Sequence, residues 1–524
     1  MNLKEWIFTT DHKRVGVLYL IGSIAAFGVA GVMAMLMRIE LSAIGPTITG
    51  SPTQYNTGLY AHGAVMILGV LIPALTGFFA NFCIPLMIGA KDVAFPRVNA
   101  LSVWLFYVGI ILALLTFVIP DPPDIMWTGY PPYSIITTGN TAMYSFTVLI
   151  LGFASIIGGV NFLTTVAYMR APGVTWNKLP IFVWCVLGAF VLQLIFVPVL
   201  GTAVTLISMD KYLGTNFFDP SKGGDVLTYQ NLFWFYSHPA VYVIFLPFIG
   251  VIFEIVATFS RNRVFNYKSV VYGGIGGIVL ISGEVWVHHL YVSGMADWLR
   301  IGTMMTTLAI SVPVGLMVIG LIGTLYKGSI SFETPMVYAI GFMFLFLIGG
   351  LTGIPLAVPS LTLNLSETYY VVGHFHYVMA VAGTFAIFGG VYYWFPKITG
   401  KMYNEFWGKA GFWVTFVGVN IVFWTMMDIG ARIGLPRRYY DFAQFPEAAS
   451  AQYIMTAGSA LVGIGFALAV INWIVGAIKG PPAGDNPWGS HSLEWTTVSP
   501  PPHGNWPTPP VMPADWYPYG NGKE

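Results

Sequence analysis

The chain has 524 residues, of which 56% are hydrophobic and 9% are charged, whereas an average soluble domain carries roughly 25% charged residues. This composition excludes a soluble globular protein, because the apolar side chains exceed what a core needs and lipid must cover the remainder. The formal net charge is +1, so no basic field is present to attract nucleic acid, and we expect no nucleic-acid partner.

About twelve apolar segments are long enough to cross the hydrocarbon core of a lipid bilayer, which takes about 20 residues in a helix. They lie near residues 15–37, 60–89, 101–119, 143–168, 181–208, 232–259, 270–292, 302–326, 336–356, 370–396, 411–432 and 453–478. Helices are expected because backbone polar groups in lipid must be satisfied within their own segment. The predicted fold class is all-α, a polytopic membrane protein with about twelve transmembrane helices.

The lysines and arginines predict the orientation of these spans. With twelve crossings both termini share one side, and sixteen of the 23 basic residues fall on that side. The positive-inside rule makes it the cytoplasmic side. We expect a membrane domain over residues 1–479 and a Pro-rich cytoplasmic tail over 480–524. The N-terminus has no cleavable signal pattern, and we expect Cys83 and Cys185, each inside an apolar segment, to serve in packing or to face lipid.

Six of the nine histidines fall inside the spans, and the others, among them His12, fall outside. The six are His62, His238, His288, His289, His374 and His376. A strongly polar side chain in hydrocarbon costs a few kcal/mol unless it has a partner, so each is a candidate functional residue. One such imidazole is often only bonded to a neighbouring helix. Six of them favour metal or haem ligation.

The spacing of these histidines separates them into groups. His374 and His376 are two residues apart, which on a helix at about 100° per residue turns their side chains roughly 200° apart, toward two different metal centres. His288 and His289 are adjacent and can converge on one ion.

His238 is followed directly by Pro239, and Tyr242 lies four residues further on, which places a phenol on the same helix face as the imidazole. Pro239 removes a backbone donor and is expected to bend the helix, either as an ordinary kink or to open space for an ion.

Several segments together carry a specific resemblance. They are Leu232 to Tyr242, Val285 to His289, Glu367 to Tyr377, Ile88 to Arg97, Gly434 to Tyr439, and Asn486 to Pro502. With the ordered set of six histidines, they make essentially the whole chain resemble subunit I of the A-type haem-copper oxidases. Tyr236 and Ser237 ahead of His238, with Ala240 where many members carry Glu, are similar to the A2 subgroup.

The resemblance implies two haems, of the haem a type, and a copper ion called CuB. It assigns His62 and His376 as the axial ligands of a low-spin haem and His374 as the proximal ligand of a high-spin haem. His238, His288 and His289 would hold CuB, with Tyr242 covalently joined to His238 and both at the catalytic centre.

The resemblance also assigns residues around the haems and along a proton path. Arg437 and Arg438 would bind haem propionates, Arg38 would contact the formyl group of the low-spin haem, and Trp127 would lie beside that haem. Interfacial snorkelling is the alternative for the arginine pair. The proton path would begin at Asp92 and continue along polar side chains to the Tyr-Ser pair. These residues are Tyr19, Asn81, Asn99, Ser155, Asn161, Tyr236 and Ser237.

Three departures from the family pattern limit what the resemblance implies. Met317 replaces the lysine of the second, K proton path and Val314 replaces a hydroxyl. Ser366 and Glu367 stand where a His-Asp pair contributes to a bound magnesium, which counts against that metal. Glu284, one turn before His288, occupies a normally apolar position. We hypothesise that Glu284 supplies a protonable group near CuB and Tyr242; the alternative is a carboxyl bonded to a neighbouring helix for packing.

The function that follows is a terminal respiratory oxidase that reduces dioxygen to water, coupled to proton translocation. The chain lacks a dinuclear copper centre, so a subunit II that carries it is expected, with subunit III, small subunits, and cytochrome c or a blue-copper protein as electron donor. The location implied is the bacterial inner membrane. A quinol oxidase, a nitric oxide reductase with non-haem iron, and a cofactor-free channel or transporter are the alternatives.

Overall fold

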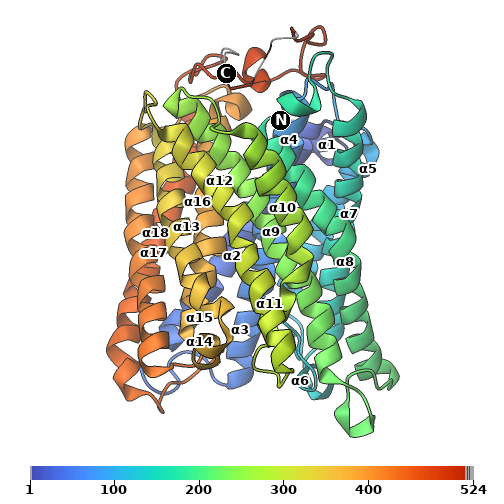
Figure 1. Cartoon of the computed structure of the whole chain (residues 1–524), viewed down its shortest axis with the longest axis vertical. Helices are drawn as coiled ribbons and strands as arrows, with labels where there is room; N and C mark the ends of the chain where they lie inside the picture. Colours follow the sequence, from blue (N-terminus) through green and yellow to red (C-terminus); the bar gives the residue numbers. More distant parts are fainter. Residues whose placement is uncertain (1–2, 514–515, 517, 520–524) are drawn as a thin grey trace.

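The computed structural model describes residues 3–513, 516 and 518–519. The described residues form helices that stand side by side in one bundle (Figure 1), and they contain two isolated β-bridges but no strand. Twelve helical segments are long and apolar enough to cross a membrane. The structure therefore confirms the all-α class and the predicted number of spans.

The twelve spans follow the predicted segments in order. Seven spans are single helices: α2 (His12–Glu40), α5 (Pro96–Leu115), α7 (Thr141–Tyr168), α8 (Ile181–Leu213), α9 (Val226–Ser260), α13 (Thr334–Ala357) and α17 (Glu405–Ile433). Three spans are runs of consecutive helices: the second is α3 (Pro52–Ala64), η1 (Val65–Leu71), η2 (Pro73–Phe79) and α4 (Ala80–Met87); the seventh is η5 (Ser269–Ile275), α10 (Gly276–Ile281), η6 (Ser282–Glu284) and η7 (Trp286–Leu290); the tenth is α15 (Tyr369–Phe375), η8 (His376–Val381) and α16 (Ala382–Thr399). Two spans are pairs: the eighth is α11 (Asp297–Ala309) with α12 (Ser311–Leu325), and the twelfth is η9 (Pro446–Ala448) with α18 (Ala449–Lys479).

Shorter helices lie outside the spans. They are α1 (Leu3–Ile7), α6 (Tyr133–Ile136), η3 (Trp176–Lys178), η4 (Pro220–Lys222), α14 (Pro359–Leu365) and η10 (Leu493–Thr496). Figure 1 shows the two ends of the chain at the same end of the bundle, which we call the terminal end, while α6 and α14 lie at the opposite end. This arrangement is the one that an even number of crossings requires.

Several spans begin earlier than their apolar segments because polar residues cap them. The side chains of Asp11, Ser51 and Asp225 accept hydrogen bonds from backbone N–H groups in the first turns of α2, α3 and α9. Such caps satisfy donors that have no partner within the helix. Hydropathy does not identify these first turns because they contain polar residues. For this reason α9 starts at Val226 although its apolar segment starts near residue 232.

The winding of the bundle is irregular where the histidines lie. The wider π-helical winding of η8 begins at His376, directly after α15 ends at Phe375. The tighter 3-10 winding of η6 and η7 carries Glu284, His288 and His289. Departures of this kind from α-helical winding change the direction of side chains and often occur at functional sites.

The segment after α18 folds over the terminal end of the bundle instead of extending away from it. The backbone N–H of Met402 donates to the carbonyl of Pro481 at 2.9 Å, and that of Met512 donates to Pro172 at 2.9 Å. Leu493 and Trp495 of this segment are buried. Cys83 and Cys185 are buried and unpaired, so they pack in the interior and do not face lipid.

Candidate functional site

Three histidines converge between α9 and η7. The possible ligand nitrogens of His238, His288 and His289 all lie within 4.8 Å of one another. The His238 Nδ1 atom is 3.1 Å from His289 Nε2, and the ring centroids of His288 and His289 are 4.4 Å apart. Neutral imidazole nitrogens at this spacing suit a copper or zinc ion, and this triad is the one group with metal-ligand spacing found among the described residues.

Neighbouring side chains fix the orientation of the three rings. Trp234 stacks on His289 with ring centroids 3.6 Å apart, and Thr307 Oγ1 lies 3.2 Å from His288 Nδ1. The Tyr242 hydroxyl lies 3.1 Å from His238 Nε2, one helical turn away along α9. α9 continues through Pro239 from Val226 to Ser260. The covalent link between Tyr242 and His238 stays a prediction.

His62 and His376 face each other from two separate spans. Their ring centroids are 6.4 Å apart and their planes differ by 5°. His62 Nδ1 lies 3.0 Å from the carbonyl of Ala30, and His376 Nδ1 lies 2.8 Å from that of Val372. Because each Nδ1 is engaged by a carbonyl, Nε2 is the nitrogen left to ligate a metal. The two rings, parallel and from separate spans, would therefore hold one metal between them through their Nε2 atoms.

His374 turns toward a different helix from His376. Its Nδ1 atom lies 2.9 Å from the carbonyl of Gly349 and 3.3 Å from Thr352 Oγ1, both on α13. A Cβ atom at Gly353 would lie 2.8 Å from the His374 ring, so the glycine is required for this close approach. The structure thus sends the two histidines to separate positions, the arrangement that the spacing predicted.

Trp127 lies beside His62, and Arg38 is buried in α2, the helix whose Ala30 carbonyl faces His62. Arg38 is 6% exposed, and its guanidinium donates a short hydrogen bond to Gln452, while its buried Nε has no partner in the described protein. An unpartnered buried donor is costly unless another group meets it, which fits a bound cofactor. Trp127 packs against Gly63, next to His62.

Arg437 and Arg438 lie in the loop after α17, at the opposite end of the bundle. Arg437 donates to both carboxylate oxygens of Glu367, from Nε at 3.0 Å and from Nη2 at 2.5 Å. Arg438 Nη1 is 3.7 Å from the same carboxylate. Burial and the charge of Arg437 lower the pKa of Arg438. The two guanidinium groups are therefore partly enclosed at the surface.

Most of the predicted proton-path residues line one cavity. It is bordered by Tyr19, Asn81, Asn99, Ser155 and Tyr236. The Asn99 amide donates to Asn81 Oδ1 at 2.5 Å, and the Asn99 Oδ1 atom and the Ser237 hydroxyl are buried without a partner in the described protein. An unpartnered buried polar atom of a residue that lines a cavity, such as Asn99 Oδ1, is a site that ordered water can satisfy.

We did not predict two further polar residues of this cavity from the sequence. Thr76 and Ser102 also line it, and the Tyr19 hydroxyl donates to Ser102 Oγ at 2.9 Å. The position of Ser102, three residues after Asn99 on α5, places both side chains on one helix face. That spacing could have identified it. By contrast, Asn161 bonds the backbone of Phe95, its amide oxygen accepting at 2.8 Å, and it serves a connecting loop.

Glu284 and Met317, two of the departures from the family pattern, lie in different surroundings. The side chain of Glu284 is exposed on the surface of the bundle, and its backbone carbonyl accepts from Thr306 at 3.3 Å. This position counts against a carboxyl enclosed beside Tyr242, because the 3-10 winding directs it outward. Met317 is fully buried in α12 and offers no protonable group. The role of Glu284 in proton delivery stays a prediction.

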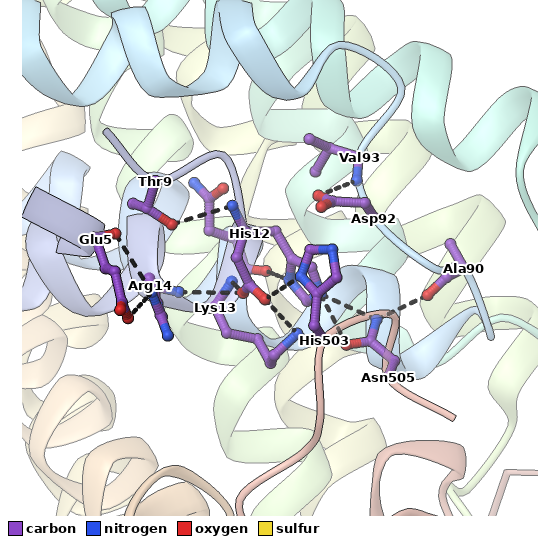
Figure 2. A network of polar contacts seen from close by, with 12 residues as sticks. Glu5, Thr9, His12, Lys13, Arg14, Ala90, Asp92, Val93, His503 and Asn505 are labelled. Carbon is purple, nitrogen blue, oxygen red and sulfur yellow. Dashed lines mark hydrogen bonds and ion pairs between the residues drawn. The ribbon is translucent and has the colours of Figure 1, made fainter. Parts of the chain in front are cut away.

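Asp92 lies in the loop after α4, at the terminal end. Burial raises the pKa of this carboxyl to about 6. A cluster from both ends of the chain lies next to it (Figure 2): the His503 ring is 3.1 Å from Asp11 Oδ2, and the buried Asn505 side chain accepts from Lys13 Nζ at 2.8 Å. Asn505 also donates to the carbonyl of Ala90 at 2.8 Å, two residues before Asp92.

Comparison with known proteins agrees with this geometry. A family model described as cytochrome c and quinol oxidase polypeptide I matches residues 14–463. The chain is 39% identical over 516 residues to cytochrome c oxidase subunit 1 of Thermostichus vulcanus, covering 98% of this chain and 92% of the relative. It is 44% identical over 515 residues to a probable cytochrome c oxidase subunit 1-alpha of Streptomyces avermitilis, covering 97% and 87%.

A solved structure shares the fold. It is a heme-copper terminal oxidase dimer studied by cryo-EM, with a TM-score of 0.78 and 19% identity, and the match covers 90% of this chain and 84% of that chain. The chain belongs to the cytochrome c and quinol oxidase polypeptide I family. It is a multi-pass membrane enzyme, the catalytic subunit of a terminal oxidase that contains several subunits and uses haem and copper.

Proposed function

We propose that this oxidase subunit reduces dioxygen to water with electrons that come from cytochrome c or a blue-copper protein. The observation that carries the proposal is the arrangement of the six histidines. One parallel pair, His62 with His376, stands beside a separate ligand, His374, and a triad in contact with a tyrosine, Tyr242. Two axial ligands, one proximal ligand and a three-nitrogen copper site are what two haems and one copper ion require.

Each of these groups has protein residues that fit it. His62 and His376 would hold a low-spin haem, with Arg38 at its substituents and Trp127 beside it. His374 would hold a high-spin haem, and His238, His288 and His289 would hold CuB. The unpartnered Arg38 Nε supports haem a, whose formyl group is an acceptor. When bound, the haems and copper would carry the donor's electrons and form the centre at which dioxygen is reduced.

The chain's own residues supply protons and orientation to this centre. Tyr242 holds its hydroxyl against His238, where it can release a proton and an electron beside the metals. Protons must cross the apolar bundle on polar side chains and ordered water. The cavity that begins near Asn81 and Asn99 and reaches Tyr236 supplies such a route, with Asp92 at its entrance. Proton translocation would use this route, since Met317 closes the second path.

The assembly and location follow from the same assignment. We place both termini in the cytoplasm of a bacterium and the chain in its inner membrane, because the basic residues are concentrated on the side of the termini. Residues 1–479 would form the membrane domain and 480–524 a cytoplasmic tail. The partners would be a subunit II with a dinuclear copper centre, subunit III and small subunits.

The test is a measurement on the intact complex. Reduced-minus-oxidised spectra with haem extraction give the number and type of haems, and metal analysis gives copper or non-haem iron. Oxygen consumption is then measured with reduced cytochrome c, a blue-copper protein or a quinol. Two haems, copper and turnover with cytochrome c or the copper protein support the proposal. Quinol as the only donor, or non-haem iron with nitric oxide reduction, would overturn it.

A further inference from the structure

Glu367 and Arg437 form a bidentate ion pair at the end of the bundle opposite the termini. Both carboxylate oxygens accept from the guanidinium, Oε2 from Nε at 3.0 Å and Oε1 from Nη2 at 2.5 Å. Arg438 adds a second cation 3.7 Å away. Burial works to raise the pKa of Glu367, but the hydrogen bonds and charges of the two arginines outweigh it and lower the pKa. The carboxyl is therefore an anion at neutral pH.

The backbone joins the same two segments. The Arg437 N–H donates to the carbonyl of Glu367 at 2.9 Å, and the Tyr369 N–H donates to the carbonyl of Leu435 at 2.9 Å. Glu367 and Arg438 both have left-handed backbone conformations, with φ of 60° and 71°. Such conformations in residues other than glycine persist where their surroundings determine them. The ion pair and these backbone bonds thus fasten the arginine loop to the residues that lead into α15, the helix that carries His374.

The family resemblance implies a magnesium ion at this place, and the residues do not fit one. Ser366 stands where an imidazole ligand is usual, and its hydroxyl lies 3.3 Å from Thr362 Oγ1. Magnesium requires oxygen ligands, but Arg437 already occupies both oxygens of Glu367. Among the described residues, the histidine triad is the group of His, Cys, Asp and Glu side chains with metal-ligand spacing, and Glu367 belongs to no such group.

We propose that the Glu367–Arg437 ion pair takes the place of the divalent cation, and that Glu367 is a positioning residue for the arginine loop. The bidentate geometry holds the planar guanidinium in one orientation, as a metal would hold its ligands. One carboxylate against two guanidinium groups leaves a net charge of +1 at this point. That charge is directed at the carboxylates of a bound haem, so this part of the inference rests on the proposed function.

The first experiment measures metal in the intact complex. Cells are grown with excess Mn²⁺, which substitutes for magnesium and has an EPR signal, and the complex is washed with EDTA. Parent, E367Q and D428N are compared, because Asp428 forms an exposed ion pair with Arg432 at the same end of the bundle. Either no retained Mn²⁺, or equal Mn²⁺ in parent and E367Q, supports the proposal. One Mn²⁺ per complex in the parent and D428N that E367Q loses would overturn it.

The second experiment measures the midpoint potentials of the haems by spectroscopic titration. E367Q removes the negative charge beside Arg437, so we expect a positive shift, while E367D keeps the charge and returns the potential toward that of the parent. D428N should match the parent. Equal potentials in E367Q and D428N would overturn the positioning role. If E367Q does not fold, the haem midpoint potentials of E367D can still be measured and compared with those of the parent. The Mn²⁺ measurement needs no haem, so it stands if the proposed haem placement fails.

Discussion

Two regions of the bundle hold their polar side chains differently. Toward the end opposite the termini, three imidazoles are held by main-chain carbonyls. Toward the terminal end, polar side chains surround a cavity. His62, His374 and His376 each direct Nδ1 at a backbone carbonyl at 2.8–3.0 Å. Along the cavity, by contrast, Asn99 Oδ1 has no partner in the described protein, and Ser237 Oγ, directly after the cavity-lining Tyr236, has none either. Carbonyls of packed helices fix a ligand in one direction, while open polar groups can exchange bonds with water. Metal binding needs the first condition and proton movement needs the second.

Removing one ligand of the histidine triad tests the metal-binding side of this comparison, and we expect the largest effect there. His289→Ala leaves two imidazoles for the copper site, too few to retain copper against chelation. We expect oxygen consumption to fall below detection and copper to be lost, while the low-spin haem spectrum persists. Metal analysis and an oxygen electrode check this. Copper retained at the parent level would contradict the assignment.

Asp92→Asn tests the proposed proton route along the cavity. A positioned proton donor typically contributes about 10²–10⁴-fold to rate, and we expect turnover to fall by about 10²-fold without loss of haem or copper. Asp121→Asn, in the loop at the opposite end, is the control. Parent-like turnover in Asp92→Asn, measured by oxygen consumption, would remove Asp92 from the route.

The pH profile refines the same test. Burial raises the pKa of Asp92 from 3.8 to about 6. The neutral form is therefore favoured in the folded protein; this contribution to stability is complete below about pH 4 and is lost as pH rises through about 6. We expect the part of turnover that depends on protonated Asp92 to decline over the same range. A profile of oxygen consumption against pH should show an inflection near 6 that Asp92→Asn lacks.

A smaller change tests how precisely His374 is held. In Gly353→Ala the new Cβ would lie 2.8 Å from the His374 ring, and overpacking of this kind costs about 1–3 kcal/mol. We expect weaker retention of one haem and a lower melting temperature, measured by haem extraction and thermal unfolding. Gly350→Ala, where nothing lies within 4 Å of the new Cβ, is the matched control. Equal effects of both substitutions would show that His374 tolerates displacement.

The smallest effect is expected where the chain ends meet. Asn505→Ala removes the amide that bonds Lys13 and Ala90, and an unsatisfied buried group costs about 1–3 kcal/mol. We expect a lower melting temperature and faster proteolysis of the segment after α18. Thr508→Ala, at an exposed position of the same segment, is the control. No change in either measurement would mean that the segment is held by other contacts.

The sequence was sufficient for the spans and for the grouping of the histidines, because apolar length and angular spacing are local properties. It was insufficient where distant segments meet. Nothing near Asn505 indicates that its amide reaches Lys13, and the spacing around Glu284 does not reveal that 3-10 winding turns the carboxyl outward. The pairing of Glu367 with Arg437 likewise depends on two loops 70 residues apart.

The contact between Asn505 and the start of α2 has a consequence for biosynthesis. His12 and Lys13 leave the ribosome near the beginning of translation, whereas Asn505 is added almost five hundred residues later. The loop that carries Asp92 therefore acquires its final neighbours only when translation is nearly complete. Because we propose that protons enter beside Asp92, we expect a chain whose synthesis stops before residue 505 to lack a complete proton entrance even when its helices already span the membrane.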